Sequence, residues 1–386
     1  MTVYAPDGAF AAAWTREHVE AIRLEPRVMA PAIDPGFPVM SDAVWVWDTW
    51  PLTDLDMRPV SFDGWHVIFS LVAPRRLGFH DRHPIASIGW FSSRDGRSWR
   101  YRGAVLRGGS ALGTRQWAGS AVLVGDRVHL FYTAAGEGRP GHDPDWLTND
   151  PLQRIALATA TITSAGGDVA FTGAAFGDSR VVAEADGRLY QTPEQARGGE
   201  IIYAFRDPFV FAEGGQVYMT FSGNTAGHEC FTGNVGLARA LDESFERWEL
   251  LPPLLHANGV NQQLERPHFV VRNGRHHLFF ISHIETYAPG LTGPDGLYGF
   301  VGDGLRSDYE PLNGSGLVIA NEPSRPPQRY SDYVMPDWLV EGFVDTVGDR
   351  VGGTLAPTLR LEVDGTRASV AEQLDYGLIP AMAERP

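Results

Sequence analysis

The sequence contains no lysine, one cysteine and no long run of apolar residues. All 32 basic side chains are arginine, and with 47 acidic side chains the formal net charge is −15. We interpret the missing lysine as a compositional habit of the source genome. The acidic balance argues against a nucleic-acid partner, which needs a cationic footprint, and against an anionic membrane surface. It is compatible with a soluble protein and a neutral substrate.

The single cysteine, Cys230, excludes an intrachain disulfide and a cluster of thiolate metal ligands. We expect it to be a small buried apolar side chain. No stretch approaches 18 apolar residues, so no membrane-spanning helix is predicted. Residues 1–26 lack a positive segment followed by an apolar one, and a conventional signal peptide is therefore not visible.

The composition predicts an all-β protein with many turns. Hydrophobic residues make up 43% and aromatic residues 11% of the chain, which also has 44 glycines and 27 prolines. One short helix is predicted over residues 15–23, with Thr15 as its N-cap. Residues 136–150 are turn-rich and predict a surface loop, and no change in composition marks a domain boundary.

A turn followed by an alternating apolar strand recurs along the chain. Glycine in each turn supplies the positive φ that a hairpin needs. Three copies continue into a further strand, a polar turn and an aromatic residue. About five units of four strands are typical of a β-propeller, with a β-sandwich as the alternative. The turns are Asp63-Gly64, Gly125-Asp126, Gly214-Gly215, Asn273-Gly274 and a weaker fifth at Gly348-Asp349.

Four polar or aromatic residues begin the strands that precede four of these turns. They are Asp48, Trp117, Asp207 and Glu265. If the first strand of each unit lines the central axis, these side chains take similar places in successive units and converge at one mouth.

Each acid has a simpler explanation when it is considered alone. Asp48 lies in VWVWDTW at 44–50, where several tryptophans beside a carboxylate are typical of a sugar site, although a paired strand acid is the alternative. Asp207 in FRDPF and Glu265 in LERPHF each precede or follow an arginine, as in a local ion pair. Three acids at matching repeat positions favour one shared site.

Three carboxyl groups around one pocket suit the cleavage of a glycosidic bond. One carboxylate attacks the anomeric carbon, and a second group protonates the leaving oxygen. We expect Glu265 to be protonated through burial and neighbouring carboxylates. Arg206 and Arg266 are predicted to clamp hydroxyl or carboxylate groups with their fixed fork of donors.

Seven ordered motifs between about Trp14 and Met382 resemble glycoside hydrolase family 68. That family holds levansucrases, inulosucrases and bacterial sucrose-cleaving β-fructofuranosidases, and the chain looks most like its shorter Gram-negative forms. The motifs are VWDTWPL at 46–52, TRQWAG at 114–119, FRDPFVF at 205–211, GVNQQLERPHF at 259–269, LTGPDGLYGFV at 291–301, YSDYVMPD at 330–337 and DYGLIPAM at 375–382.

The resemblance implies one five-bladed β-propeller domain over residues 1–386, with a central negatively charged pocket. Residues 1–40 would form an N-terminal extension whose short helix packs on the propeller. The resemblance places the nucleophile on Asp48, the transition-state stabiliser on Asp207 and the general acid/base on Glu265. It places sugar-binding positions on Trp47, Trp117, Ala118, Arg206, Gln263, Arg266, His283 and Tyr330.

The chain departs from the family pattern at three positions. Ala118 stands where Gram-positive members carry serine, as in the short forms. Gln262 stands where an aspartate often helps to bind calcium, so we expect no structural metal, and no cofactor is implied. Leu264 is more apolar than expected beside the acid/base and could alter the preference for acceptors.

The implied activity is that of a retaining, levansucrase-like fructosyltransferase that cleaves sucrose and transfers fructose to fructan, other sugars or water. A sucrose-hydrolysing β-fructofuranosidase, an arabinan-cleaving furanosidase and a non-catalytic carbohydrate-binding propeller are the alternatives. The expected partners are sucrose and saccharide acceptors, with no nucleic acid or membrane. The resemblance implies a monomer or weak homo-oligomer, extracellular or periplasmic without a recognisable signal peptide, with the cytoplasm as the alternative.

Overall fold

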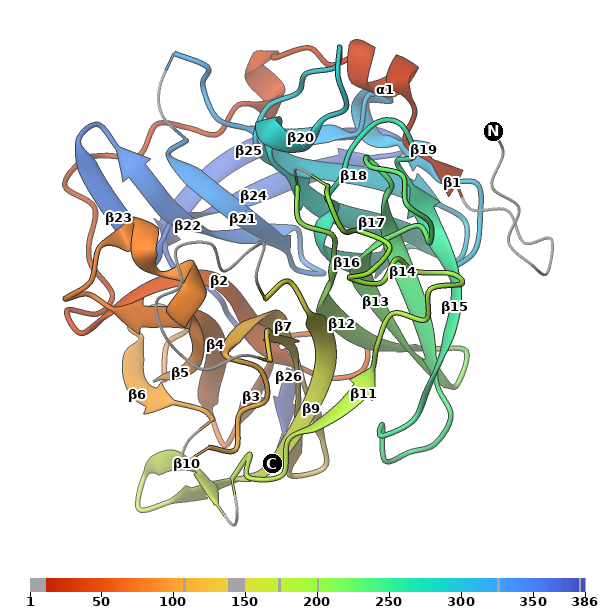
Figure 1. Ribbon diagram of the computed structural model, residues 1–386. Coiled ribbons are helices and arrows are strands. Elements are labelled where there is room, and N and C mark those ends of the chain that lie inside the picture. Colours follow the sequence, from red (N-terminus) through yellow and green to blue (C-terminus); the bar gives the residue numbers. More distant parts are fainter. Residues whose placement is uncertain are drawn as a thin grey trace.

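The computed structural model describes residues 12–106, 109–137, 150–172, 175–199, 201–324, 327–381 and the backbone of 383–385 (Figure 1). Strands dominate these residues, and the only α-helix among them is α1, Arg16–Glu20. No helix in the described part of the chain is long and apolar enough to cross a membrane. Most of the predicted loop 136–150 lies outside the described residues.

The strands form five antiparallel blades in chain order. In blades 2, 4 and 5 the outer part of the blade is divided between two short or bent strands. Blade 1 contains β2 Val44–Thr53, β3 Val60–Phe62, β4 Trp65–Pro74, β5 Ser87–Ser93 and β6 Arg100–Ala104. Blade 2 contains β7 Arg115–Val124, β8 Arg127–Ala135, β9 Gln153–Ala165, β10 Asp168–Thr172 and β11 Arg180–Ala183.

Blade 3 follows the four-strand pattern with no division. It contains β12 Phe205–Glu213, β13 Gln216–Asn224, β14 Gly233–Ala240 and β15 Trp248–His256. Blade 4 contains β16 Glu265–Arg272, β17 Arg275–Ser282, β18 Gly296–Gly302, β19 Glu310–Pro311 and β20 Leu317–Ala320. Blade 5 contains β21 Arg329–Val334, β22 Leu339–Val347, β23 Arg350–Leu355, β24 Pro357–Asp364 and β25 Arg367–Tyr376.

The first strand of every blade lies near the middle of the molecule, where β2, β7, β12, β16 and β21 surround one axis (Figure 1). Blades 1 and 2 are joined by a short parallel pairing of Leu52 with Ala121 and of Thr53 with Val122. The predicted β-propeller is confirmed, and the β-sandwich alternative is wrong.

Glycine turns connect strands in the way that the repeat predicts, with one exception. Asn273 and Gly274 both have positive φ, 52° and 75°, and join the first two strands of blade 4. The weak fifth copy is misplaced, because Gly348-Asp349 joins β22 to β23, the second and third strands of blade 5. The corresponding turn of that blade is formed by residues 335–338.

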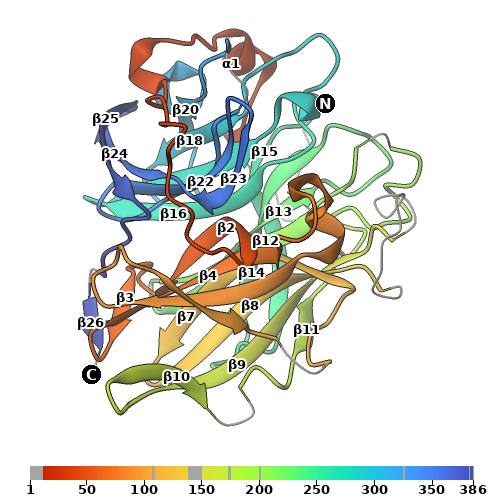
Figure 2. The ribbon, with the colours of Figure 1, turned by 90° about the vertical axis from the view of Figure 1, so that its left-hand side faces the viewer.

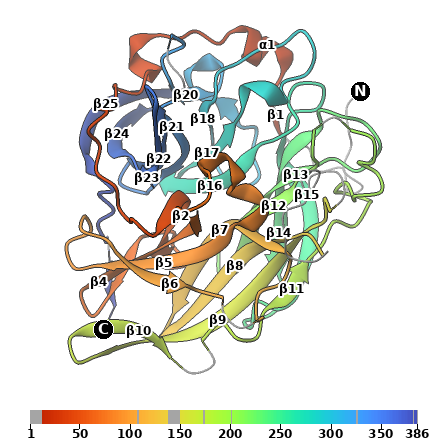
Figure 3. The same ribbon diagram turned by 60° about the vertical axis from the view of Figure 1, so that its left-hand side comes forward.

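The segment before β2 packs on the outer edges of the blades. Thr15 caps α1 as predicted, with its hydroxyl accepting from the His18 amide at 3.4 Å, although the helix ends at Glu20. Strand β1, Ala12–Ala13, pairs in parallel with β15, and Trp14 donates from Nε1 to the Ser315 carbonyl at 3.1 Å. From α1 the chain runs past β25 to β2 (Figure 3). Shorter 3₁₀ turns are η1 Pro26–Val28, η2 Phe79–Asp81, η3 His83–Ile85, η4 Ile284–Thr286 and η5 Leu312–Gly314.

The other end of the chain returns to blade 1. Strand β26, Ala383–Arg385, pairs in parallel with β3 beside the C-terminus (Figure 2). The expectation of a buried cysteine is wrong, because Cys230 is exposed.

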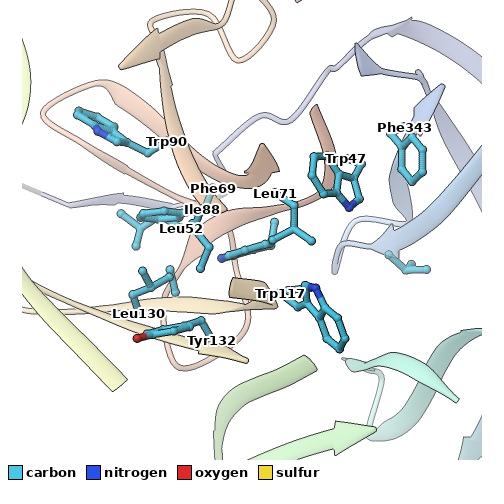
Figure 4. Packing of buried hydrophobic residues seen from close by; sticks show 14 of the residues in the cluster. Trp47, Leu52, Phe69, Leu71, Ile88, Trp90, Trp117, Leu130, Tyr132 and Phe343 are labelled. Atoms are coloured by element: carbon cyan, nitrogen blue, oxygen red, sulfur yellow. The ribbon is translucent and has the colours of Figure 1, made fainter. Parts of the chain in front are cut away.

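The core lies between neighbouring blades and extends up to the axis. Phe69, Leu71, Leu130 and Tyr132 are almost fully buried in one cluster that extends over blades 1, 2, 4 and 5. Trp47, Trp117 and Phe343 belong to the same cluster and also line a cavity (Figure 4). The packed core therefore supports the walls of an axial hollow.

Candidate functional site

A β-bulge interrupts the first strand of every blade at the same level. In β2, for example, Trp47 pairs with Leu71 and Trp50 pairs with Phe69. The chain thus advances three residues along β2 for two residues along β4. Equivalent shifts follow Trp117, Arg206, Glu265 and Tyr330 in the other four blades. A bulge bends its strand and redirects side chains. The repeated bulges therefore turn five sets of side chains toward the axis.

The bulges create two rings of residues around the axis. Four of the five second-ring residues are non-glycine residues with positive φ, between 47° and 62°, which is a strained conformation typical of functional sites. The first ring is Trp47, Trp117, Arg206, Glu265 and Tyr330. The second ring is Asp48, Ala118, Asp207, Arg266 and Ser331.

This arrangement refines the predicted equivalence of Asp48, Trp117, Asp207 and Glu265. Trp117 and Glu265 belong to the first ring, whereas the two aspartates belong to the second. The four residues therefore occupy matching positions in their blades, except that the aspartates are shifted by one residue relative to Trp117 and Glu265. The offset places the glutamate one step away from the two aspartates along its strand.

A cavity of about 210 Å³ opens at this level of the axis. Four carboxyl groups and three guanidinium groups line it, together with aromatic and aliphatic side chains. Ten of the eleven predicted site residues are in its wall. They are Trp47, Asp48, Trp117, Arg206, Asp207, Gln263, Glu265, Arg266, His283 and Tyr330.

Ala118 is the predicted site residue that does not line the cavity. Its methyl group is buried in the core cluster, and its carbonyl accepts a hydrogen bond from Thr133 Oγ1 at 3.0 Å. Because Thr133 Oγ1 also accepts from the Asp207 amide at 2.9 Å, the backbone of Ala118 helps to support the second ring. The expectation that Ala118 contacts a substrate directly is not met by this geometry.

Several lining residues were not predicted from the sequence. Arg82 and His83 come from the η2–η3 segment between β4 and β5, which has no counterpart in the repeat. Asp345 is an acid inside the apolar strand β22 beside a register shift, the same signal that identified Asp48. The other additions are the apolar residues Leu71, Ile202, Ile281 and Phe343.

Glu265 is held by donors on both of its carboxyl oxygens. Arg206 Nη2 donates to Oε1 at 2.9 Å, and the Tyr330 hydroxyl donates to Oε2 at 2.9 Å. Nε2 of His283 lies 3.6 Å from Oε2, and its ring stacks on Tyr330 with centroids 4.1 Å apart. Burial raises the pKa of Glu265, but His283, Arg206 and these hydrogen bonds lower it by more, so the pKa lies below its ordinary value. The direction of this shift is opposite to the one expected for a protonated Glu265.

The pKa of Asp207 is shifted in the opposite direction to that of Glu265. Its Oδ2 accepts from the Arg266 amide at 3.1 Å, and Arg206 Nε lies 3.6 Å away. Burial raises the pKa of Asp207 to about 7, with Arg206 opposing and with Glu265 and Asp48 contributing. The pocket thus separates the pKa values of two carboxyls that share Arg206.

Asp48 is located on the opposite side of the ring, at the bulge of blade 1. Burial raises its pKa, Arg266 and the Ser331 hydroxyl lower it, and Glu265 raises it again. Because Asp48 and Glu265 line the same small cavity and Glu265 raises the pKa of Asp48, both can contact one small ligand. Two carboxyl groups that share one ligand are what glycosidic chemistry needs.

Arg266 connects the second ring across several blades. Its Nη1 donates to the Ser331 carbonyl at 2.8 Å, and its Nη2 donates to the Thr49 carbonyl. Its amide donates to Asp207, so one residue joins blades 1, 3, 4 and 5. The side chain of Arg266 therefore fixes the backbone beside Asp48 rather than pairing with the neighbouring Glu265.

His283 is positioned by an acid outside the cavity. Its Nδ1 lies 3.3 Å from Oδ1 of Asp295, which also accepts from the Ile284 amide at 2.7 Å. Burial lowers the pKa of His283, but Asp295, Glu265 and Asp48 raise it above its ordinary value. The imidazole therefore holds a proton more strongly than an isolated histidine does.

Gln262 and Leu264 take no part in the cavity wall. The Gln262 side-chain oxygen accepts from the Phe231 amide at 2.5 Å, and Leu264 is fully buried in the core. Leu264 can therefore influence the shape of the pocket only through the residues that pack against it.

Comparisons with known proteins identify relatives over almost the whole chain. A family model described as Levansucrase/Invertase matches residues 3–233 and 229–380. The levansucrase of Erwinia amylovora is 39% identical, with 96% of this chain and 97% of the relative covered. The extracellular sucrase of Zymomonas mobilis is 40% identical, with 96% and 95% covered. The structure of the inulosucrase of Halalkalicoccus jeotgali bound to kestose matches with a TM-score of 0.89 at 39% identity, covering 97% of this chain and 99% of that one.

Proposed function

The chain belongs to glycoside hydrolase family 68, the levansucrase/invertase family, and we propose that it cleaves sucrose and transfers the fructosyl unit through a covalent enzyme intermediate. It is an enzyme of the fructosyltransferase type, as its levansucrase and inulosucrase relatives are. The observation that carries the assignment of residues is that Asp48, Asp207 and Glu265 line one cavity together with Trp47 and Trp117.

In the proposed first step, Asp48 attacks the anomeric C2 of the fructosyl unit. The C2–oxygen bond to glucose breaks, and Glu265 gives its proton to the departing glucose oxygen. An ester between C2 and the Asp48 carboxylate remains. The negative charge that Asp48 loses ends on Glu265, which has given its proton to glucose. The step therefore needs an ionised Asp48 and a protonated Glu265 at the same time.

His283 can supply the proton that Glu265 needs, and once it has done so its neutral ring no longer lowers the pKa of Glu265. Its Nε2 is 3.6 Å from Glu265 Oε2, so a small movement lets a proton pass to the carboxylate. Sucrose displaces water from the cavity and offers hydroxyl groups to Arg206, which weakens the stabilisation of ionised Glu265. Both effects favour a protonated Glu265 once the substrate is bound.

Asp207 is proposed to hold fructosyl hydroxyl groups during both steps. Hydrogen bonds from the sugar hydroxyls to this carboxyl strengthen as positive charge develops on the ring. The positive φ of 59° and the amide contacts to Thr133 and Arg266 keep the group in place. Trp47 and Trp117 supply apolar faces for the carbon-bound hydrogens of the sugar.

In the second step, Glu265 removes a proton from an acceptor, which attacks C2 and releases Asp48. Water gives free fructose, a sugar gives an oligosaccharide, and a fructan gives a longer fructan. We infer that saccharides and water are the acceptors, that residues 1–386 form one catalytic domain, and that the enzyme works outside the cytoplasm, as the name of the Zymomonas mobilis sucrase indicates for that relative.

Product analysis tests the proposal. The protein is incubated with concentrated sucrose, and glucose, free fructose and longer products are separated by chromatography. Glucose release with a deficit of free fructose is expected for transfer. Equal amounts would identify a hydrolase, and no glucose from sucrose would contradict the function and leave the carbohydrate-binding and arabinan-cleaving alternatives.

A further inference from the structure

A buried carboxyl group lies beneath the second ring and has no part in the steps above. Glu341 lies on β22, where it pairs with Tyr333 of β21, and its side chain is 1% exposed. Neither of its carboxyl oxygens has a hydrogen-bond partner among the described residues. An ionised carboxylate in such surroundings is strongly unfavourable, so the position requires a neutral group.

The propeller repeat shows what this position does in another blade. The pairing of Glu341 with Tyr333 corresponds to the pairing of Thr220 with Phe209 in blade 3. There the Thr220 hydroxyl donates to the carbonyl of Pro267, 3.1 Å away in the next blade. The residue that corresponds to Pro267 in the blade after blade 5 is Thr49, directly after Asp48. A protonated Glu341 therefore occupies the place from which blade 3 supplies a hydroxyl donor.

Charged and titratable groups face Glu341 from three blade-forming strands. Arg266 comes from β16, Asp48 from β2, and Arg329, Asp332 and Tyr333 come from β21. Asp332 is already paired with Arg329 through two hydrogen bonds. Burial raises the pKa of Glu341 to about 8, since the two arginines do not outweigh burial and the neighbouring Asp332 and Asp48.

The guanidinium of Arg266 is the group through which the charge of Glu341 can affect the reaction. Arg266 donates to the carbonyl group of Thr49, directly after Asp48, and to that of Ser331 in the neighbouring blade 5. A negative charge on Glu341 competes for that guanidinium and also makes ionisation of Asp48 less favourable. Both effects act against the attacking carboxylate.

We propose that Glu341 is a positioning residue for fructosyl transfer: its neutral carboxyl leaves Arg266 free to brace the backbone beside Asp48, and its ionisation loosens that brace. The inference rests on the proposed function, because it needs Asp48 as the attacking group. It predicts a loss of activity at alkaline pH that arises in part from a group that never touches the substrate.

The test compares the pH dependence of kcat/KM for sucrose in wild type and Glu341→Gln, measured as glucose release from about pH 5 to 9. Gln keeps the shape of a neutral carboxyl but cannot ionise. The ratio of wild type to variant is expected to be constant at the acidic end, to fall about twofold by pH 8 and to fall by up to about tenfold by pH 9, where most of Glu341 is ionised. A merely structural role would change the ratio equally at every pH, and a flat ratio would overturn the proposal.

Two further variants keep the test decisive. Glu362→Gln, at an exposed position of β24 in the same blade, makes the same chemical change and is expected to follow wild type at every pH. Glu341→Thr introduces the side chain that blade 3 carries and is expected to behave as Glu341→Gln. If neither Glu341 variant folds near neutral pH, the proposal is wrong, because a neutral group should replace a neutral carboxyl.

Different results would refute the proposed function and the role of Glu341. If the wild-type protein releases no glucose from sucrose at any pH, the proposed function fails and the role of Glu341 fails with it. If wild type releases glucose and the ratio stays flat, only the role of Glu341 is overturned.

Discussion

Arg206 donates from Nη2 to Oε1 of Glu265 at 2.9 Å, although the two residues belong to neighbouring blades. Its Nε lies 3.6 Å from Asp207, so one guanidinium serves two carboxyls of the site. Both Arg206 and Glu265 are first-ring residues, which is why they can meet at the axis. This cross-blade contact helps to lower the pKa of Glu265 below its ordinary value.

Removing the charge of Arg206 is expected to raise the pKa of Glu265, because Arg206 is one of the groups that lower it. In Arg206→Met, kcat/KM for sucrose should fall at least about 100-fold, since the clamp and the pairing are lost together. The pH profile should move to higher pH. Arg206→Lys is the matched control, which keeps the charge but not the fork of donors. A Met variant with an unmoved profile would contradict the pairing.

Asp48→Asn should abolish turnover of sucrose, because the amide cannot form the covalent intermediate. We expect kcat to fall by at least about 10⁴-fold, or about 5.4 kcal/mol in the activation free energy. Steady-state glucose release measures it. Asp303→Asn, whose side chain is 85% exposed, makes the same change away from the site and should leave turnover intact. Near-native turnover in Asp48→Asn would disprove the nucleophile assignment.

Much of the fold could be predicted because its signals are local. Glycine turns and alternating strands recur within short windows, and Asn273-Gly274 adopts the positive φ values that the turn requires. The weak copy at Gly348-Asp349 was assigned to the wrong connection because a turn by itself does not show which two strands it joins. The five bulges gave no sequence signal beyond the polar residues that they carry.

The charge state of Glu265 could not be predicted because its partners come from other blades. In the sequence its nearest cation is Arg266, but the side chain of Arg266 points to Thr49 and Ser331. The donors that hold Glu265 are Arg206 and Tyr330, 59 and 65 residues away. Such contacts exist only after the blades have closed around the axis.

Glu265→Gln should slow catalysis while sucrose still binds. The amide keeps an acceptor for Arg206 but can neither give nor take the proton, so kcat should fall by about 10²- to 10⁴-fold. Calorimetric titration with sucrose measures binding separately from turnover. Wild-type rates in this variant would exclude the acid/base role, and loss of binding would instead indicate a disturbed pocket.

Asp295→Asn should lower the pKa of His283, because Asp295 raises it through its hydrogen bond and its charge. A neutral imidazole no longer supplies a proton near Glu265, and kcat/KM should fall about tenfold for each unit by which the pKa drops below the working pH. Titration of the His283 imidazole by NMR, assigned with a His283→Gln variant, follows the pKa directly. Asp303→Asn is again the control, and an unchanged imidazole titration would contradict the pairing.

The ionisation of Glu341 should also make the stability of the fold depend on pH. Its pKa is about 8 in the folded protein and ordinary in the unfolded chain, so the folded state binds more protons between these values. The free energy of unfolding of wild type should therefore decrease relative to Glu341→Gln as pH rises toward 8, by at most about 1.4 kcal/mol per pH unit. Denaturant unfolding at several pH values measures this difference, with Glu362→Gln expected to follow wild type. Parallel curves for wild type and Glu341→Gln would show that Glu341 has the same protonation in both states, and that a neutral carboxyl does not lie beneath Asp48.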